Sequence, residues 1–204
     1  MAKATEVPAE QVARLRGIIT QYFSSRALYA AAALDVAGAL AGGTGSALCS
    51  IVKATPGLRG VVFDLPHVGE RARTFIAAQG LADRCEFAGG SFFESVPPGA
   101  GAYFMKHILH DWGDAECATI LVACRKAMDA SARLLICERI VPGGNEPSSA
   151  KLIDLHMMMT NHGGRERTEK EYRALLEAAG FELQRVLPTS TPWSVIEAMK
   201  AGER

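Results

Sequence analysis

Three titratable residues stand where an α/β fold could bring them together. His110 lies in the segment 106–112 (KHILHDW), directly after the apolar run 101–105. Glu138 follows the apolar run 134–137, and Glu166 lies in the turn 163–168 (GGRERT). Open α/β sheets carry out their chemistry at the carboxyl ends of their strands. A histidine that two carboxylates orient is suited to general-base catalysis, which is the chemistry we expect here.

The composition favours a protein that acts on small molecules. The chain has 204 residues, of which 49% are hydrophobic, enough to bury a core. Its 22 Lys and Arg balance 22 Asp and Glu, so net charge indicates neither a nucleic-acid nor a lipid partner. The amino terminus lacks the apolar core of a signal peptide, and the most apolar stretch, 27–41, is too short to cross a bilayer. We therefore expect a cytoplasmic location and no membrane partner.

The cysteines show no metal-binding pattern. They lie inside apolar segments without C-x-x-C spacing, so we expect buried, reduced thiols and no metal ion. These residues are Cys49, Cys85, Cys117, Cys124 and Cys137.

From residue 46 the sequence alternates between helix-period and strand-like segments. We predict helices over 46–54, 67–79, 114–128, 148–160 and 169–179, and strands over 61–65, 84–88, 102–106, 133–138, 182–187 and 193–199. This alternation predicts an α/β fold with a mostly parallel sheet and helices on both faces. Asp114 is expected to cap one helix, Thr168 and Glu171 to form a capping box, and Gly180 to end the last helix.

The amino-terminal part is predicted to be helical. Apolar residues recur at intervals of three and four from 8 to about 29, and a second helix is predicted through Leu40. An apolar stripe of this kind needs a partner, and we expect a homodimer. The predicted organisation is thus a short helical, dimerisation-like segment, 1–41, followed by an α/β domain, 42–204.

A glycine cluster and an acid form a candidate nucleotide site. The cluster 42–45 (GGTG) leads into a helix, so its backbone could approach a ligand closely. Asp64 ends the next strand, where an acid can accept hydrogen bonds from ribose hydroxyls. An ordinary loop and a turn cap are the structural alternatives for these two features.

From Gly42 to about Ala201 the chain resembles the plant caffeic-acid-type and bacterial small-molecule O-methyltransferases. The phrases that carry the resemblance are, in order, GGTGS, LRGVVFDLPHV, GGSFFES, AYFMKHILHDW, ICERIVP and NHGGRERTEKEY. The resemblance implies a Rossmann-like class I methyltransferase sheet with S-adenosyl-L-methionine as the cofactor. It also implies that the methyl acceptor is a hydroxyl of a small aromatic molecule.

The resemblance assigns roles on the acceptor side of the site. His110 corresponds to the catalytic base, and Glu138 and Glu166 to the carboxylates that hold its ring. Met157 and Asn161 fall where the family positions the ring and the oxygen of the acceptor. No metal takes part in such a mechanism.

The resemblance also assigns residues to the cofactor. They comprise the glycine loop beneath the methionine part, an acid on the ribose, two residues beside the adenine and a lysine. These cofactor-binding candidates are Gly43, Gly45, Asp64, Ser91, Phe92 and Lys106.

The chain departs from the family pattern before the glycine loop. The family carries a winged-helix dimerisation domain and then an apolar strand that ends in an acid. Here SRALYAAAALDVAGALA runs straight into GGTGS, which resembles an internal deletion that leaves the first central strand missing or substituted. Residues 34–40 could replace that strand, although their alanines and Gly38 make them poor strand formers. The alternatives are that this segment stays helical or that a neighbouring chain closes the gap.

Further departures concern the cofactor side and support a second hypothesis. Residues 39–41 lack the expected acid, and Ser91 and Gly101 stand where aspartates are common in the family. The second hypothesis is therefore a catalytically impaired relative that acts as a noncatalytic binding or dimerisation protein. A nicotinamide-dependent oxidoreductase would share the fold, but the sequence lacks a clean G-x-G-x-x-G motif after a strand.

Overall fold

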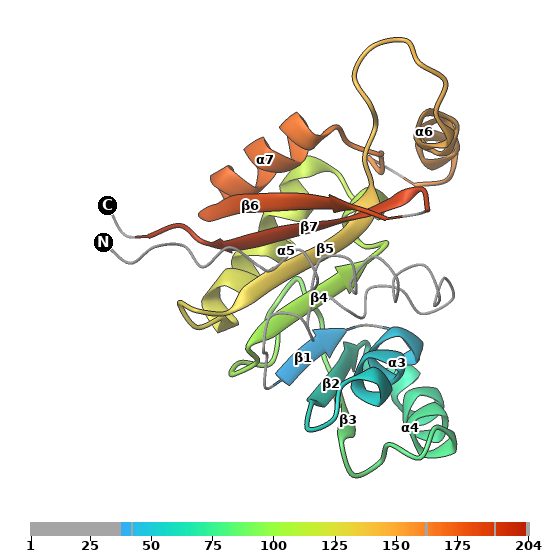
Figure 1. Ribbon diagram of the computed structural model, residues 1–204, viewed down its shortest axis with the longest axis vertical. Coiled ribbons are helices and arrows are strands. Elements are labelled where there is room, and N and C mark those ends of the chain that lie inside the picture. Colours follow the sequence, from blue (N-terminus) through green and yellow to red (C-terminus); the bar gives the residue numbers. More distant parts are fainter. Residues whose placement is uncertain (1–37, 42, 162, 190, 203–204) are drawn as a thin grey trace.

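The computed structural model describes residues 38–41, 43–161, 163–189 and 191–202 (Figure 1). The helix predicted from 8 to about 29 lies outside these ranges, as does Gly42 of the glycine cluster. The division of the chain at residue 41 therefore stays a prediction.

A seven-stranded sheet forms the centre of the described part of the chain, in the order β3-β2-β1-β4-β5-β7-β6. The neighbouring pairs from β3 to β5 are parallel, whereas β7 runs antiparallel to both β5 and β6. The strands are β1 (Gly38–Ala41), β2 (Arg59–Asp64), β3 (Cys85–Gly89), β4 (Ala102–Lys106), β5 (Arg133–Arg139), β6 (Phe181–Pro188) and β7 (Trp193–Lys200). The mostly parallel α/β sheet expected from the sequence is confirmed.

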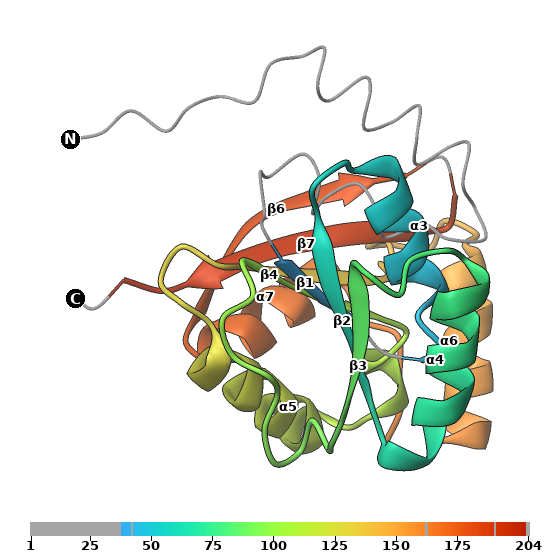
Figure 2. The ribbon, with the colours of Figure 1, turned by 90° about the horizontal axis from the view of Figure 1, so that it is seen from below.

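Helices cover both faces of the sheet, as Figure 2 shows from below. They are α3 (Ser46–Ala54), α4 (Gly69–Ala78), α5 (Asp114–Ala127), α6 (Ser149–Thr160) and α7 (Glu169–Ala178), with 3-10 turns η1 (Pro66–Val68) and η2 (Leu109–Asp111). Successive residues of β4 point to opposite faces. Tyr103 and Met105 pack with residues of α5 and α7, and Phe104 packs with residues of α3 and α4. The core thus consists of two apolar layers separated by the sheet.

Helix α6 stands apart from the sheet at the end of a long loop (Figure 1). Its exposed side chains include four large apolar residues, Leu152, Leu155, Met158 and Met159. None of the helices in the described ranges is long and apolar enough to span a membrane.

The central position that the sequence predicted to be missing or substituted is occupied by β1. It pairs in parallel with β2 on one side and β4 on the other, with Leu40 opposite Val61 and Tyr103. The helix predicted through Leu40 is therefore wrong for residues 38–40, which lie in β1. Each unpaired backbone group left in β2 and β4 would cost about 1–3 kcal/mol, and closing that gap outweighs the weak strand propensity of alanine and glycine.

The predicted capping box and the predicted helix stop were correct, whereas the prediction of Asp114 as a cap was wrong. Thr168 and Glu171 form the expected capping box, and Gly180 follows α7 with φ 78°. Helix α5 instead has Gly113 as its N-cap, without a side-chain cap, and Asp114 is its first residue. The Asp114 carboxylate accepts hydrogen bonds from Arg165 and Arg167. All five cysteines are free and buried, as expected.

We predict that Gly45→Ala destabilises the fold by about 2–4 kcal/mol, because alanine there meets both an unfavourable backbone and a clash. Gly45 has φ 84°, and a Cβ atom would lie 2.6 Å from Cγ2 of Val62. Gly57 has the same φ with nothing within 4 Å of such an atom, so Gly57→Ala should cost only about 1–2 kcal/mol. Urea unfolding measures both losses, and equal losses would contradict the close approach of Gly45 to Val62.

Candidate active site

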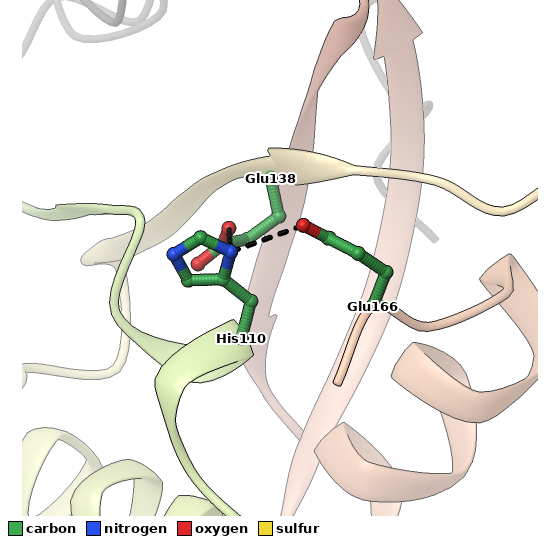
Figure 3. Close-up of side chains that lie close together, drawn as sticks. All are labelled: His110, Glu138 and Glu166. Atoms are coloured by element: carbon green, nitrogen blue, oxygen red, sulfur yellow. Dashed lines mark hydrogen bonds and ion pairs between the residues drawn. The ribbon is translucent and has the colours of Figure 1, made fainter. Parts of the chain in front are cut away.

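Three elements bring His110, Glu138 and Glu166 together (Figure 3). His110 lies in η2, just after β4, and Glu138 lies near the end of β5. Strands β4 and β5 are parallel neighbours with Lys106 opposite Cys137, so their carboxyl ends meet at one edge of the sheet. Glu166 comes from the segment that joins α6 to α7 and reaches the same edge.

Both carboxylates approach the same nitrogen of the His110 ring (Figure 3). Its Nδ1 is 3.0 Å from Oε1 of Glu166 and 4.0 Å from Oε2 of Glu138. The His110 side chain is 14% exposed, and both glutamate side chains are fully buried. When Nδ1 donates to Glu166, Nε2 keeps its lone pair and can accept a proton.

Glu138 also shapes the backbone that carries His110. Its Oε1 accepts hydrogen bonds from the amides of Ile108 and Leu109, at 2.9 and 3.0 Å. Burial raises the pKa of Glu138 to about 7, even though His110 and these two amides act in the opposite direction. The carboxyl group therefore holds the turn in place and titrates close to neutral pH.

Opposing influences act on the histidine. Burial by itself would lower the pKa of His110, but the hydrogen bond from its ring to Glu166 and the charge of Glu138 raise it above its ordinary value. The pKa values of both groups are raised, and the two neighbouring groups form a set in which the protonation of one affects that of the other. Such a set can take up a proton and stabilise the imidazolium that forms.

The second ring nitrogen faces a different pair of side chains. Nε2 of His110 is 3.6 Å from Oδ1 of Asp111, and that oxygen accepts a 2.6 Å hydrogen bond from Nδ2 of Asn161. The structure thus brings Asn161 to the base side of the ring. Met157 is buried in α6, whereas Asn161 and Glu166 line a cavity of about 470 Å³ together with Met158. On this side the cavity wall is formed by Met158 and not by the predicted Met157.

A second cavity, of about 430 Å³, lies beside the carboxyl ends of β2 and β4. Its wall includes four predicted cofactor residues, Gly43, Asp64, Phe92 and Lys106. Apolar side chains from the sheet, from α5 and from the link between β3 and β4 also line it, among them Phe63, Ile120 and Val96. A cavity with polar groups at strand ends and an apolar interior suits a ligand that is part aromatic ring and part sugar.

Two predicted cofactor residues lie outside that wall. Gly45 is buried against Val62, so its position is explained by packing. The Ser91 hydroxyl accepts a hydrogen bond from the amide of Phe93 at 3.3 Å. Asp64 already accepts two bonds, from the amide of Gly43 at 2.7 Å and from its neighbour Leu65 at 2.6 Å.

Sequence reasoning missed His107, which lies between the cavity and His110. His107 lines the cavity, and its ring stacks between those of His110 and Trp193, with centroids 5.2 and 5.1 Å away. Burial and the charges of Lys106 and His110 lower the pKa of His107 to about 4, so this ring stays neutral. Its φ of 54° is uncommon outside glycine, and no sequence signal announces such a backbone angle.

His110, Glu138 and Glu166 together offer ligand atoms of the kinds that bind a metal cation. The ligand atoms of His110, Glu138 and Glu166 all lie within 4.8 Å of one another. Nδ1 of His110 and Oε1 of Glu166 are, however, already at hydrogen-bond distance from each other.

We predict that Glu138→Gln flattens the dependence of stability on pH. The raised pKa values mean that the folded protein holds more protons than the unfolded chain, so the free energy of unfolding falls as pH rises from 4.5 to about 7 for Glu138 and above 6.5 for His110. The glutamine oxygen can still accept the bonds from Ile108 and Leu109, but it does not titrate. Urea unfolding across this range tests the prediction, and parallel curves for the wild type and the variant would contradict it.

Comparisons with known proteins identify the family. A profile of the O-methyltransferase domain matches residues 23–182. Phenazine O-methyltransferase of Lysobacter antibioticus is 44% identical over 156 residues, covering 76% of this chain and 46% of the relative. Caffeic acid 3-O-methyltransferase of Zinnia elegans is 43% identical over 145 residues, covering 69% of this chain and 39% of the relative.

A solved structure extends the agreement to the fold. It is an O-methyltransferase from neocarzinostatin biosynthesis in complex with S-adenosylmethionine and 2-hydroxy-5-methyl naphthoic acid, with a TM-score of 0.77 at 28% identity. The match covers 94% of this chain and 57% of that chain. The chain spans about half the length of the curated relatives it matches. The resemblance inferred from the sequence is confirmed, and the chain belongs to the O-methyltransferase domain family.

Proposed function

We propose that this chain is the catalytic part of an S-adenosyl-L-methionine-dependent O-methyltransferase that acts on a hydroxyl of a small aromatic molecule. The observation that supports this most strongly is the placement of His110 against two buried carboxylates. They lie near the cavity that has polar groups at strand ends and an apolar interior. Relatives named for phenazine and caffeic acid, and a structural neighbour solved with a naphthoic acid, support an aromatic acceptor.

The residues around the cavity of about 430 Å³ beside β2 and β4 fit the cofactor. Its apolar interior suits an adenine ring, and Asp64 stands at the rim with oxygens that retain lone pairs for ribose hydroxyls. Gly43, Phe92 and Lys106 line the same wall. When bound, the cofactor supplies a methyl group that its sulfonium makes electrophilic.

In the proposed mechanism, His110 performs the proton transfer. Nε2 accepts the hydroxyl proton of the acceptor, while Glu166 and Glu138 stabilise the imidazolium. Asn161 and Asp111 lie beside Nε2, where they can orient the acceptor oxygen. Fixing that oxygen in line with the methyl group lowers the entropic part of the barrier.

We also propose that the protein acts as a cytoplasmic homodimer. The exposed apolar residues of α6 and the apolar periodicity between residues 8 and 29 both support an association between chains. The balanced charge of the chain favours a small-molecule partner over nucleic acid.

A noncatalytic relative is the second candidate. Among the described residues that line the cavity, Asp64 is the only acid, and one of its oxygens is already bonded to Gly43. Calorimetric titration with S-adenosylhomocysteine separates the two candidates. Saturable heat at micromolar concentrations supports the enzyme, and its absence supports the noncatalytic relative.

We expect His110→Ala to lower methyl transfer by about 10²–10⁴-fold, the usual contribution of a general base. The affinity for S-adenosylhomocysteine should stay close to that of the wild type, because His110 lies on the acceptor side. Transfer of labelled methyl groups to catechols and naphthols is the assay. His67→Ala, on an exposed position of η1, is the matched control and should retain activity. A His110→Ala protein with most of its activity would exclude His110 as the base.

Asp64→Ala should weaken binding of S-adenosylhomocysteine about 10-fold or more, because hydrogen bonds to a charged carboxylate are lost. Asp83→Ala is the control, since Asp83 is exposed and lies next to β3 at the opposite edge of the sheet. Isothermal titration of both variants measures the effect. Equal affinity in the two variants would remove Asp64 from the cofactor site.

A further inference from the structure

The largest fully buried side chain of the described residues is that of Arg167, which directly follows Glu166. Its backbone is anchored to the chain beyond β5: Arg167 forms a parallel bridge with Ile140, and its carbonyl accepts a 2.9 Å hydrogen bond from the amide of Val141. The proposed mechanism does not use this guanidinium. A charged group withdrawn from water is costly unless its donors are satisfied, so its partners indicate its role.

The guanidinium of Arg167 brackets the turn that carries His110. Nη1 donates to the carbonyl of Leu109 at 2.8 Å, and Nη2 donates to the carbonyl of Trp112 at 2.9 Å. Nε and Nη2 also donate to Oδ1 of Asp114, at 3.0 and 2.7 Å. The two carbonyls lie one residue before and two residues after His110, so the planar fork fixes both sides of the turn.

A carboxylate holds the amides of the same turn, and the guanidinium holds its carbonyls. Glu138 accepts from the amides of Ile108 and Leu109, and Arg167 donates to carbonyls on either side of His110. A buried ion pair is weak support for stability by itself, because well-packed apolar residues often replace one without loss. Here, however, Arg167 contacts the backbone on both sides of His110, so its rigid guanidinium fork can fix the orientation of that turn.

We propose that Arg167 is a positioning residue, a clamp on the 109–112 turn that keeps the ring of His110 against Glu166 and Glu138. The proposal rests on the proposed function and deepens it. Because Arg167 and Glu166 are consecutive, one short segment supplies both the clamp and one of the carboxylates. A shift of that segment would move both together.

Arg165 provides a matched control. It lies two residues earlier, donates to Oδ2 of Asp114 at 3.0 Å and to Glu171 at 2.7 Å, and is 37% exposed. Among the hydrogen bonds of the described residues, none joins its side chain to the 109–112 turn. Arg165→Lys and Arg167→Lys therefore disturb the same acidic partner, but only the second loosens the turn, since an ammonium group lacks the fork.

The test is a nuclear magnetic resonance titration of the His110 ring in the full chain, with wild type, Arg165→Lys and Arg167→Lys. The charged or titratable groups that face this ring are Glu138, Glu166, Asp111 and His107. We expect the pKa of His110 to fall in Arg167→Lys as the ring leaves the carboxylates, and to stay at the wild-type value in Arg165→Lys. The pH profile of kcat should shift by the same amount in Arg167→Lys. Its kcat should drop at least tenfold, with KM for the acceptor within about threefold.

An unchanged titration in folded Arg167→Lys, or equal shifts in both lysine variants, would overturn the proposal. If Arg167→Lys does not fold, Asp114→Asn decides, because it keeps Arg167 but weakens two of its bonds. A smaller fall in the pKa of His110 is then expected, and no fall would overturn the proposal. The titration needs no turnover, so a wild-type protein without methyl transfer would refute the proposed function and still leave the clamp to be judged.

Discussion

Two carboxylates withdrawn from water share one histidine, and this constraint organises the carboxyl edge of the sheet. Neither Glu138 nor Glu166 has solvent to stabilise its charge, so the ring of His110 is their nearest cationic partner, 3.0 Å from Glu166. Removing one member of such a buried set lowers the stability of the fold strongly, because it leaves a buried charge without a partner. Sets of this kind are found most often at functional sites.

The fold satisfies this constraint through the order of its strands. Adjacent parallel strands β4 and β5 bring His110 and Glu138 to one edge, and the antiparallel β7 closes the other side of β5. Glu138 then serves twice, as a neighbour of the imidazole and as the acceptor for two amides of the turn. The third member arrives from the link between α6 and α7, and Arg167 ties that link back to the turn. Rigid elements thus hold the His110 ring in a fixed direction, as the proposed proton transfer requires.

Local patterns in the sequence predicted much of this structure, because strand ends and helix caps depend on nearby residues. Helix α3 and strand β4 have the predicted bounds, and His110 and Glu138 lie at strand ends as expected. Glu166 lies in the predicted turn 163–168, which is part of the link between α6 and α7. What failed depended on distant partners. Gly38–Ala41 became a strand because β2 and β4 both required pairing. Asp114 is the first residue of α5 and not its cap, and its carboxylate pairs with Arg167, 53 residues away. The stacked His107 was missed because its backbone angle and ring contacts exist only in the folded chain.

The most direct measurement is of the protonation of the two His110 ring nitrogens by ¹⁵N nuclear magnetic resonance across neutral pH. The account predicts a proton on Nδ1, directed at Glu166, with Nε2 unprotonated above the raised pKa of the ring. A neutral ring that carries its proton on Nε2, or a titration below the ordinary histidine value, would contradict it.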